Sequence, residues 1–309
     1  MPATDVLLAP KLSPLYLEQL NREFTPHQQP DASNVTRIRG LACGGESKVP
    51  GELIAQLPAL EIISVMGVGY DGVDVTAAKP RGIMVTHTPD VLNDDVADLA
   101  IGLMLCASRQ LPQANQYVHE GKWANGAMPL ARKMSGARLG LVGIGRIGQA
   151  IARRALAFGM SVAYTARGAR DGLPYTFHAD VRELARQSDF LVVITPGGAG
   201  TRHMINAEVL QALGAKGILV NVARGSVVDE AALIDALQRG VIGGTGLDVF
   251  ENEPNVPQQL RDMPHVVLTP HIGSGTAQTR RAMADLAMAN LRAHFAGEPV
   301  KTPVPECRS

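Results

Sequence analysis

Three ionisable residues in the second half of the chain each stand a few positions after a run of apolar residues typical of a buried β-strand: Arg224, Glu253 and His271. The carboxyl ends of parallel strands meet at one edge of a sheet, so we expect these side chains to converge on one crevice. A guanidinium that binds an oxyanion and an imidazolium that donates a proton suit the reduction of a carbonyl next to a carboxylate.

In this interpretation Arg224 binds and polarises the substrate, and His271 protonates the carbonyl oxygen. Glu253 orients the imidazole ring and favours its charged form. Each residue also has an ordinary alternative: His271 as a hydrogen-bonded structural histidine, Glu253 as a solvated charge before Pro254, and Arg224 as a salt-bridge partner. The placement of all three at strand ends favours the catalytic interpretation.

The segment Leu139–Gly148 carries glycines in the pattern G-x-G-x-x-G, at Gly143, Gly145 and Gly148, before an Ala-rich helical stretch over Gln149–Phe158. The first glycine allows a tight turn, the second lets the backbone approach a pyrophosphate, and the third lets the helix pack against the strand. The helix N-terminus then presents N–H groups to phosphate. Such glycines also occur in ordinary loops, but the strand–turn–helix context predicts a dinucleotide site.

The end of the next predicted strand, Ser161–Tyr164, indicates which dinucleotide binds. NAD-selective sites usually place Asp or Glu there for the ribose 2′-OH. This chain has Ala166, then Arg167 and Arg170, with no carboxylate in the loop before Asp171. Because a guanidinium can bind a phosphate through two N–H groups, we predict NADP(H). The alternative is that both arginines are ordinary solvated loop residues.

Other strand ends supply further candidate binding residues. Successive N–H groups of Gly67, Val68 and Gly69, after the predicted strand Ile62–Met66, can receive a substrate carboxylate, although an ordinary tight turn is the alternative. Asp248 can face the nicotinamide or cap a turn. The remaining residues expected at the cofactor site lie in the same kind of loop: Arg146, Ile147, Thr195, Pro196, Val222, Ala223 and Gly273.

Parallel sheets must position these residues, and strand and helix signals alternate throughout the chain. Before the glycine pattern, strands are predicted at Val6–Ala9, Gly40–Cys43, Ile62–Met66 and Ile83–Thr86, and helices at Pro14–Asn21 and Gly51–Gln56. Six parallel strands are predicted after it: Gly140–Gly143, Ser161–Tyr164, Phe190–Ile194, Gly217–Asn221, Gly243–Asp248 and Val266–Leu268. A long helix over about Asn93–Glu120 precedes the pattern, and a last helix over about Thr276–His294 returns to the first lobe.

The predicted fold class is α/β, with two Rossmann-like domains, doubly wound parallel sheets and an inter-domain active-site cleft. We expect residues 1–92 and 284–309 to form a flavodoxin-like substrate-binding domain, and residues 93–283 an NADP-binding Rossmann domain. The middle of the long helix, Val96–Ala107, is nearly all apolar and must be buried on most sides. Packing against a second subunit would explain this, so we expect a homodimer.

Composition argues against several other classes of protein. The chain has 309 residues, 46% of them hydrophobic, which is enough for two cores. A formal net charge of +0 without long runs of one sign predicts neither a nucleic-acid nor a membrane partner. Cys43, Cys106 and Cys307 have no zinc-ligand spacing and no disulfide framework, so we expect no metal and a cytoplasmic location. The N-terminus is typical of a strand rather than of a signal peptide, and no apolar window suggests a membrane span.

Six stretches resemble the D-isomer-specific 2-hydroxyacid dehydrogenases: Gly67–Asp74, Asn93–Ala100, Leu139–Gly148, Asn221–Asp229, Gly246–Pro254 and Pro270–Thr276. The resemblance implies that Arg224, Glu253 and His271 are the catalytic set and that the loop of Gly67 binds the substrate carboxylate. It also implies that the helix from Asn93 is the dimerisation element and that Trp123–Leu130 reaches the partner subunit's site.

Within the family, His271–Thr276 and Arg167 are most similar to the glyoxylate/hydroxypyruvate reductases and the plant hydroxyphenylpyruvate reductases, which use NADPH. One departure is Gly197-Gly198, where those relatives usually carry Leu-Thr. This pair predicts a loop near the adenosine ribose that is more flexible than in those relatives.

Together these observations predict NADPH-dependent reduction of small 2-keto acids, with glyoxylate and hydroxypyruvate as leading substrates and, by resemblance, D-2-hydroxy acids as products. Phenylpyruvates are further candidates if Met66, Tyr70, Met128 and Leu130 leave an apolar cavity. An NAD-linked phosphoglycerate-type dehydrogenase would want a carboxylate near residue 166, and a formate dehydrogenase would lack the acid at Glu253. A dinucleotide-sensing corepressor-like protein would keep the catalytic residues but bind partner peptides, and the short tails argue against it.

Overall fold

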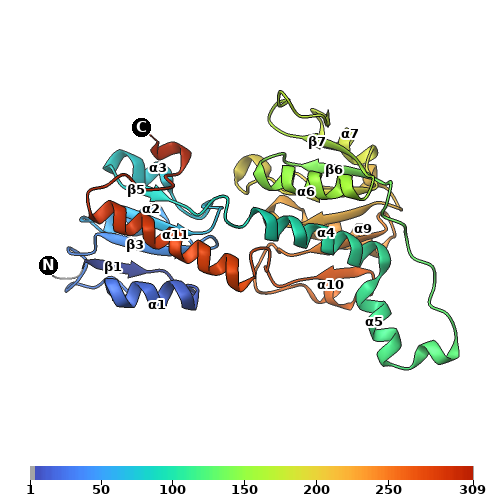
Figure 1. Cartoon of the computed structure of the whole chain (residues 1–309), viewed down its shortest axis with the longest axis horizontal. Helices are drawn as coiled ribbons and strands as arrows, with labels where there is room; N and C mark the ends of the chain where they lie inside the picture. The colour runs from blue at the N-terminus through green and yellow to red at the C-terminus, as the bar shows by residue number, and fades with distance from the viewer. Residues whose placement is uncertain (1–3, 309) are drawn as a thin grey trace. The chain divides into compact units, whose positions relative to one another are not determined.

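The computed structural model describes residues 4–308, which form two compact units (Figure 1). Unit 1 contains the described residues up to Leu92 and those from Ser274 onward, and unit 2 contains Asn93–Gly273. We expected the chain to return to the first unit at 283/284, whereas in the structure it does so at 273/274. The physical reason is that the last helix, α11 (Ala277–Phe295), is one continuous element that packs against the first helix and the fourth strand of unit 1.

Unit 1 is built on a parallel sheet of order β2-β1-β3-β4-β5, the order typical of flavodoxin-like sheets. Its strands are β1 (Asp5–Leu8), β2 (Thr25–His27), β3 (Gly40–Gly44), β4 (Ile62–Met66) and β5 (Met84–Thr86). Its other helical elements are α1 (Pro14–Glu23), α2 (Gly51–Gln56), α3 (Val75–Ala78), η1 (Lys79–Arg81) and η5 (Pro305–Cys307). The edge strand β2 was not predicted, since three residues that include a proline carry no readable alternation.

Strand β4 shows how both faces of this sheet are covered. Ile63 and Val65 point into the apolar cluster that also contains the buried Ile54 of α2. Ser64 points to the opposite face, where it accepts a hydrogen bond from Tyr16 (3.0 Å) and donates one to the carbonyl of Ala287 (3.1 Å). Helices α1 and α11, which lie side by side in Figure 1, therefore cover that face.

Unit 2 is built on a parallel sheet of order β12-β11-β10-β9-β6-β7-β8. Its strands are β6 (Arg138–Val142), β7 (Ser161–Thr165), β8 (Thr176–Phe177), β9 (Phe190–Val193), β10 (Ile218–Asn221), β11 (Gly244–Leu247) and β12 (Val266–Leu268). Six of the seven were predicted, and the missed β8 is a two-residue edge strand. Chain order reverses between the neighbours β6 and β9, which is where ligands bind in such sheets.

The helical elements of unit 2 lie on the two faces of its sheet and beside it. They are α4 (Asn93–Arg109), α5 (Leu111–His119), η2 (Lys122–Asn125), α6 (Arg146–Ala157), α7 (Val181–Arg186), η3 (Ala199–Thr201), α8 (Ala207–Leu213), η4 (Gly225–Val227), α9 (Glu230–Gln238) and α10 (Gln258–Asp262). Helices α4 and α6 pack together, while α7, α8 and α9 contribute to one apolar cluster with the opposite face. Among residues 4–308, no helix qualifies as a candidate membrane span.

The single helix predicted over Asn93–Glu120 was wrong, because the chain breaks it at Gln110. That residue adopts a left-handed backbone conformation with φ of 53°, and α5 begins immediately after it. Pro112 explains the break, since a proline inside a continuous helix would clash with the preceding turn and remove a hydrogen bond. Much of the apolar surface of α4 is buried within unit 2, against its sheet and against α6.

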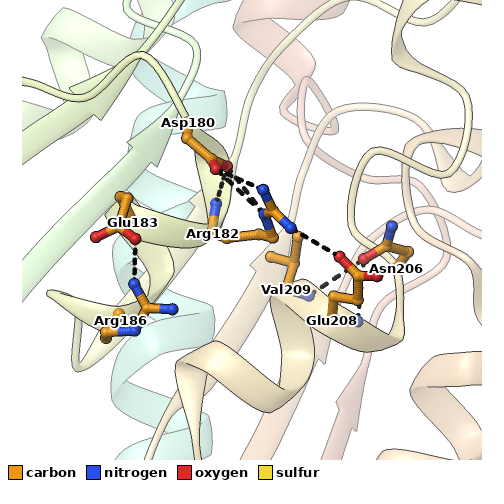
Figure 2. Close-up of polar contacts among 7 residues, drawn as sticks. All are labelled: Asp180, Arg182, Glu183, Arg186, Asn206, Glu208 and Val209. Atoms are coloured by element: carbon orange, nitrogen blue, oxygen red, sulfur yellow. Dashed lines mark hydrogen bonds and ion pairs between the residues drawn. The ribbon is translucent and has the colours of Figure 1, made fainter.

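Capping residues fix where α7 and α8 begin (Figure 2). The Asp180 carboxylate accepts from the N–H of Arg182 (2.8 Å), and the Asn206 side chain accepts from the N–H groups of Glu208 and Val209 (3.1 Å each). Arg182 also joins the two helices through Asp180 (2.9 Å) and Glu208 (3.0 Å). These helices precede and follow β9 in the chain, so the caps help to define the loop that leaves β9 at the ligand-binding edge.

Candidate active site

The glycine turn after β6 has the geometry that a dinucleotide site requires. Gly143 has a φ of +108°, and a Cβ there would lie 2.9 Å from the carbonyl oxygen of Ile194. A Cβ on Gly148 would lie 2.5 Å from the carbonyl oxygen of Gly143, so α6 packs directly on the turn. Among residues 4–308, nothing lies within 4 Å of the Cβ position of Gly145, and no side chain caps α6. The turn therefore leaves open space beside a helix N-terminus that begins with Arg146 and Ile147, which fits a pyrophosphate.

The loop after β7 lies beside this turn. Gly143 donates its N–H to the carbonyl of Thr165 (3.0 Å), and Ala166 follows directly. The side chains of Arg167 and Arg170 are exposed, and neither has an ion-pair partner among residues 4–308. Their positive charge is thus available to a phosphate next to the glycine turn.

The loop after β9 contains Thr195 and Pro196. The Thr201 hydroxyl donates to the carbonyl of Pro196 (2.8 Å), which closes the loop on itself. Gly198 has a φ of +130°, a conformation that side chains with a Cβ rarely adopt. Gly198 therefore permits a backbone conformation that would be strained with the Thr that relatives usually carry at this position.

Arg224 is carried by a loop that a buried asparagine holds in shape. Asn221 ends β10 and is 1% exposed. Its side chain accepts from the N–H of Ala223 (3.0 Å) and donates to the carbonyl of Arg224 (2.9 Å), while Val222 lies buried between them. Asn221 was not among the predicted site residues, although Asn directly before a turn is a known signal for this type of side-chain hydrogen bond.

Gly225 brings this loop into backbone contact with the loop that carries Glu253. A Cβ on Gly225 would lie 1.9 Å from the carbonyl carbon of Phe250 and 2.4 Å from the nitrogen of Glu251. Only glycine permits that approach, because any side chain would have to push the two backbones apart. This contact was also missed from the sequence, since the spacing of loops from different strands is not encoded locally.

His271 and Glu253 form the central pair of the site. The Nδ1 atom of His271 lies 2.8 Å from Oε2 of Glu253, and Oε1 of Glu253 accepts from the N–H of Phe250 (2.9 Å). Burial by itself would raise the pKa of the Glu253 carboxyl. The hydrogen bond and charge of His271, the Phe250 amide and the charge of Arg224 outweigh burial and lower this pKa. An ionised Glu253 accepts the Nδ1 proton, so Nε2 is the atom through which the ring can exchange a proton with a substrate.

Asp248 supports the segment that bears His271. Its carboxylate accepts from the Thr269 hydroxyl (2.7 Å) and from the N–H groups of Ile272 and Gly273 (2.8 Å each). Its carbonyl accepts from the N–H of His271 (2.9 Å), a residue whose φ of 52° is unusual for a side chain with a Cβ. Burial raises the pKa of the Asp248 carboxyl, although these hydrogen bonds and the charge of His271 oppose that effect. Asp248 thus holds the His271 backbone, and its contact with nicotinamide stays a prediction.

The remaining predicted substrate residues lie in unit 1. Gly67, Val68 and Gly69 follow β4 directly, at the carboxyl edge of that sheet. A Cβ on Gly67 would lie 2.7 Å from the Cα of Gly45, so the loop after β3 packs tightly on this loop. The atoms nearest to the Cβ positions of Gly67 and Gly45 belong to backbone, so the two loops meet backbone to backbone.

Taken together, unit 2 is an α/β domain with a phosphate-binding type of turn at its switch point and an Arg–Glu–His set at the same sheet edge. This combination defines the class as a nucleotide-dependent dehydrogenase. Residues 101–273 match the family model described as "D-isomer specific 2-hydroxyacid dehydrogenase, NAD binding domain". The chain belongs to the D-isomer specific 2-hydroxyacid dehydrogenase family.

Three known proteins are similar over most or nearly all of the chain. A hydroxyphenylpyruvate reductase of Plectranthus scutellarioides is 47% identical over 98% of this chain and 100% of its own length. A glyoxylate/hydroxypyruvate reductase of Arabidopsis thaliana is 49% identical over 86% of this chain and 85% of its own. The solved structure of an NADPH-dependent glyoxylate/hydroxypyruvate reductase from Sinorhizobium meliloti, in complex with NADP and malonate, is 50% identical. It covers 99% of this chain and 98% of that one, with a TM-score of 0.93.

Proposed function

We propose that this protein is an NADPH-dependent reductase that converts small 2-keto acids, first of all glyoxylate and hydroxypyruvate, to D-2-hydroxy acids. The observation that carries the proposal is the 2.8 Å pair of His271 and Glu253, on loops that follow neighbouring strands of the sheet bearing the glycine turn. The similarity to reductases of these substrates supports it.

The chain's own residues account for binding and proton transfer. NADPH, when bound, supplies a hydride to the carbonyl carbon. Arg224 binds the substrate oxygens and stabilises the negative charge that develops on the carbonyl oxygen. His271 gives its Nε2 proton to that oxygen, which completes the alcohol. Glu253 keeps the ring oriented and stabilises the imidazolium before the transfer.

The cofactor site is assembled from loops at the carboxyl edge of the unit 2 sheet. The N–H groups near Gly145 would hold the pyrophosphate, and Arg167 with Arg170 would bind the 2′-phosphate. Ala166 leaves no carboxylate to repel that phosphate. The other residues assigned to the cofactor come from the loops described above: Thr195, Pro196, Val222, Ala223, Asp248 and Gly273. In this proposal unit 2 binds NADP(H) and the loop of Gly67 in unit 1 binds the substrate carboxylate.

We also infer a homodimer from residues 111–130, the segment that follows α4. None of residues 111–130 is buried, yet four large apolar side chains there are strongly exposed: Leu111 (45%), Val118 (57%), Trp123 (69%) and Leu130 (101%). Exposed apolar groups gathered in one segment favour a protein partner, and the second copy implied by the resemblance is the one we assign. Light scattering should report a dimer for the parent protein and a smaller species for Trp123→Glu with Leu130→Glu.

The three free cysteines suit a reducing compartment such as the cytoplasm.

The proposed activity is tested by following NADPH absorbance with glyoxylate, hydroxypyruvate, pyruvate and phenylpyruvate, each also run with NADH. We expect turnover with NADPH and one or more of the first two acids, and loss of turnover in His271→Ala. A parent protein that oxidises neither cofactor with any of the four acids would refute the proposed function.

A further inference from the structure

The Gly67–Gly69 loop is held from behind by the residues that follow β5. Strands β4 and β5 are parallel neighbours, so the loop and the segment His87–Thr88 leave the sheet side by side. The N–H of Thr88 donates to the carbonyl of Gly67 (2.8 Å). The Nδ1 atom of His87 lies 2.9 Å from the carbonyl oxygen of Val68. Since a carbonyl only accepts, Nδ1 must carry a proton and donate it.

These two bonds determine where the loop's N–H groups point. In a trans peptide the C=O and the N–H of the following residue point in opposite directions. Fixing the carbonyl of Gly67 therefore directs the Val68 N–H away from Thr88, and fixing the carbonyl of Val68 directs the Gly69 N–H away from His87. Within the described chain, no backbone–backbone hydrogen bond takes up the N–H of Val68 or Gly69. Two adjacent donors are thus presented to an anion.

We propose that His87 is a positioning residue for recognition of the substrate carboxylate: its Nδ1–H fixes the peptide plane that carries the Gly69 N–H. This inference rests on the proposed function, in which the Gly67–Gly69 loop binds that carboxylate. His87 acts through the backbone and does not itself touch the substrate.

The surroundings of His87 keep its ring in this orientation. The side chain is largely buried, and the ring of Tyr70 meets it edge-on at a centroid distance of 5.3 Å. Thr302 clamps its backbone, since the N–H of His87 donates to the Thr302 carbonyl (3.1 Å) and the Thr302 hydroxyl donates to the His87 carbonyl (2.6 Å). Asn290 in α11 in turn donates to the Thr302 hydroxyl (2.8 Å).

The C-terminal segment also fixes Tyr70, the residue that follows the loop. The Tyr70 hydroxyl donates to the Glu306 carboxylate at 3.1 Å. Burial, together with the hydrogen bond and charge of Glu306, raises the pKa of Tyr70 to about 12, so the phenol remains a donor at neutral pH. The loop is thus supported through His87 and Thr302, and at the residue that follows it through Tyr70 and Glu306.

A pair of His87 variants separates positioning from general support of the core. His87→Leu removes the donor at similar volume, whereas His87→Asn keeps an N–H donor near the place of Nδ1. We expect His87→Leu to raise the KM for glyoxylate about tenfold or more, on the usual scale for losing an aligned hydrogen bond to a charged group. The Kd for NADPH, measured by fluorescence titration, should stay unchanged. His87→Asn should restore most of the parent KM.

The matched control is His27→Leu, the same substitution at another hydrogen-bonded histidine of unit 1, where the partner is Asp5 on β1 (2.6 Å). It should leave the KM unchanged. If His87→Leu does not fold, Thr302→Val replaces it in the test. This variant removes the hydrogen bond from the Thr302 hydroxyl to the His87 carbonyl, and it should also raise the KM for glyoxylate.

Three results would overturn the inference while leaving the proposed function intact: an unchanged KM in a folded His87→Leu, equal impairment of His87→Asn and His87→Leu, or a parallel loss of NADPH affinity. An inactive parent protein would instead refute the proposed function, and this inference with it.

Discussion

The closest backbone approach in the site, at Gly225, gives a sharp test of how Arg224 is placed relative to Glu253. In Gly225→Ala the new methyl would start 1.9 Å from the carbonyl carbon of Phe250 and 2.0 Å from its oxygen. Ordinary contact needs about 3.5 Å, so the loops after β10 and β11 must separate by roughly 1.5 Å. Both atoms that block the methyl belong to backbone, so a rotamer change cannot relieve the clash.

The expected cost follows from that displacement. Overpacking of this kind destabilises by about 1–3 kcal/mol, which lowers the Tm of a domain of this size by roughly 2–12 °C. A misplacement of about 1 Å in a catalytic constellation costs on the order of 100-fold in rate. We therefore expect kcat/KM for glyoxylate to fall about 100-fold, with the Kd for NADPH changed much less, because the glycine turn after β6 is not touched.

Gly102→Ala is the matched control. Gly102 lies within α4 and has no positive φ, and in the described part of the chain nothing lies within 4 Å of its Cβ position. The same chemical change there should raise stability by about 0.5–1 kcal/mol, because alanine favours a helix interior, and should leave kcat/KM unaltered. If Gly225→Ala unfolds at the parent temperature and turns over at the parent rate, the argument from backbone contact is refuted.

Three further predictions concern single side chains of unit 2. Because the folded pKa of Glu253 lies below its ordinary 4.5, the ionised carboxylate stabilises the fold above that pH, and this contribution is lost as the pH falls through the folded value. The difference in Tm between the parent and Glu253→Gln should thus be largest near neutrality and shrink below about pH 4; a constant difference would contradict the assignment. Arg167→Ala should raise the KM for NADPH roughly 5- to 30-fold, the loss of one exposed charge-assisted bond, and leave that for NADH unchanged. Asn221→Ala should lower kcat/KM about tenfold, because it releases the loop that carries Arg224. Asn221→Asp should be intermediate, because it keeps the acceptor for the N–H of Ala223. Equal activity of Asn221→Ala and the parent would exclude this role.

The sequence was most informative where a residue's role depends on its own strand or turn. Buried parallel strands read as short apolar runs, and β4 and β12 have the predicted bounds. The glycine turn was readable because Gly143 and Gly148 have local steric reasons, while Gly145 keeps the space beside the turn open. The edge strands β2 and β8 were missed because two or three residues show no periodicity, and the break at Gln110 shows that a proline outweighs a continuous helical pattern.

Contacts between loops were beyond sequence reasoning for a different reason. Whether Gly225 meets Phe250, or Asp248 accepts from Gly273, depends on how far each loop extends beyond its strand, and no local pattern encodes that distance. Asp248 was proposed as a cofactor contact from its strand-end position alone. The three groups that donate to its carboxylate all belong to the segment around His271, so its first role is set by tertiary hydrogen bonding.

The convergence of Arg224, Glu253 and His271 can nevertheless be traced to the sheet itself. Strands β10, β11 and β12 are consecutive neighbours, and adjacent strands lie about 4.8 Å apart. The backbone hydrogen bonds between these strands continue into the loops that follow them. Asp248 donates its N–H to the carbonyl of Asn221 (3.0 Å), and His271 donates its N–H to the carbonyl of Asp248 (2.9 Å). The three loops are therefore held at strand spacing past the end of the sheet. A substitution that breaks this extension should disturb all three residues together, whereas the glycine turn, four strands from β12 in the sheet order, should be spared.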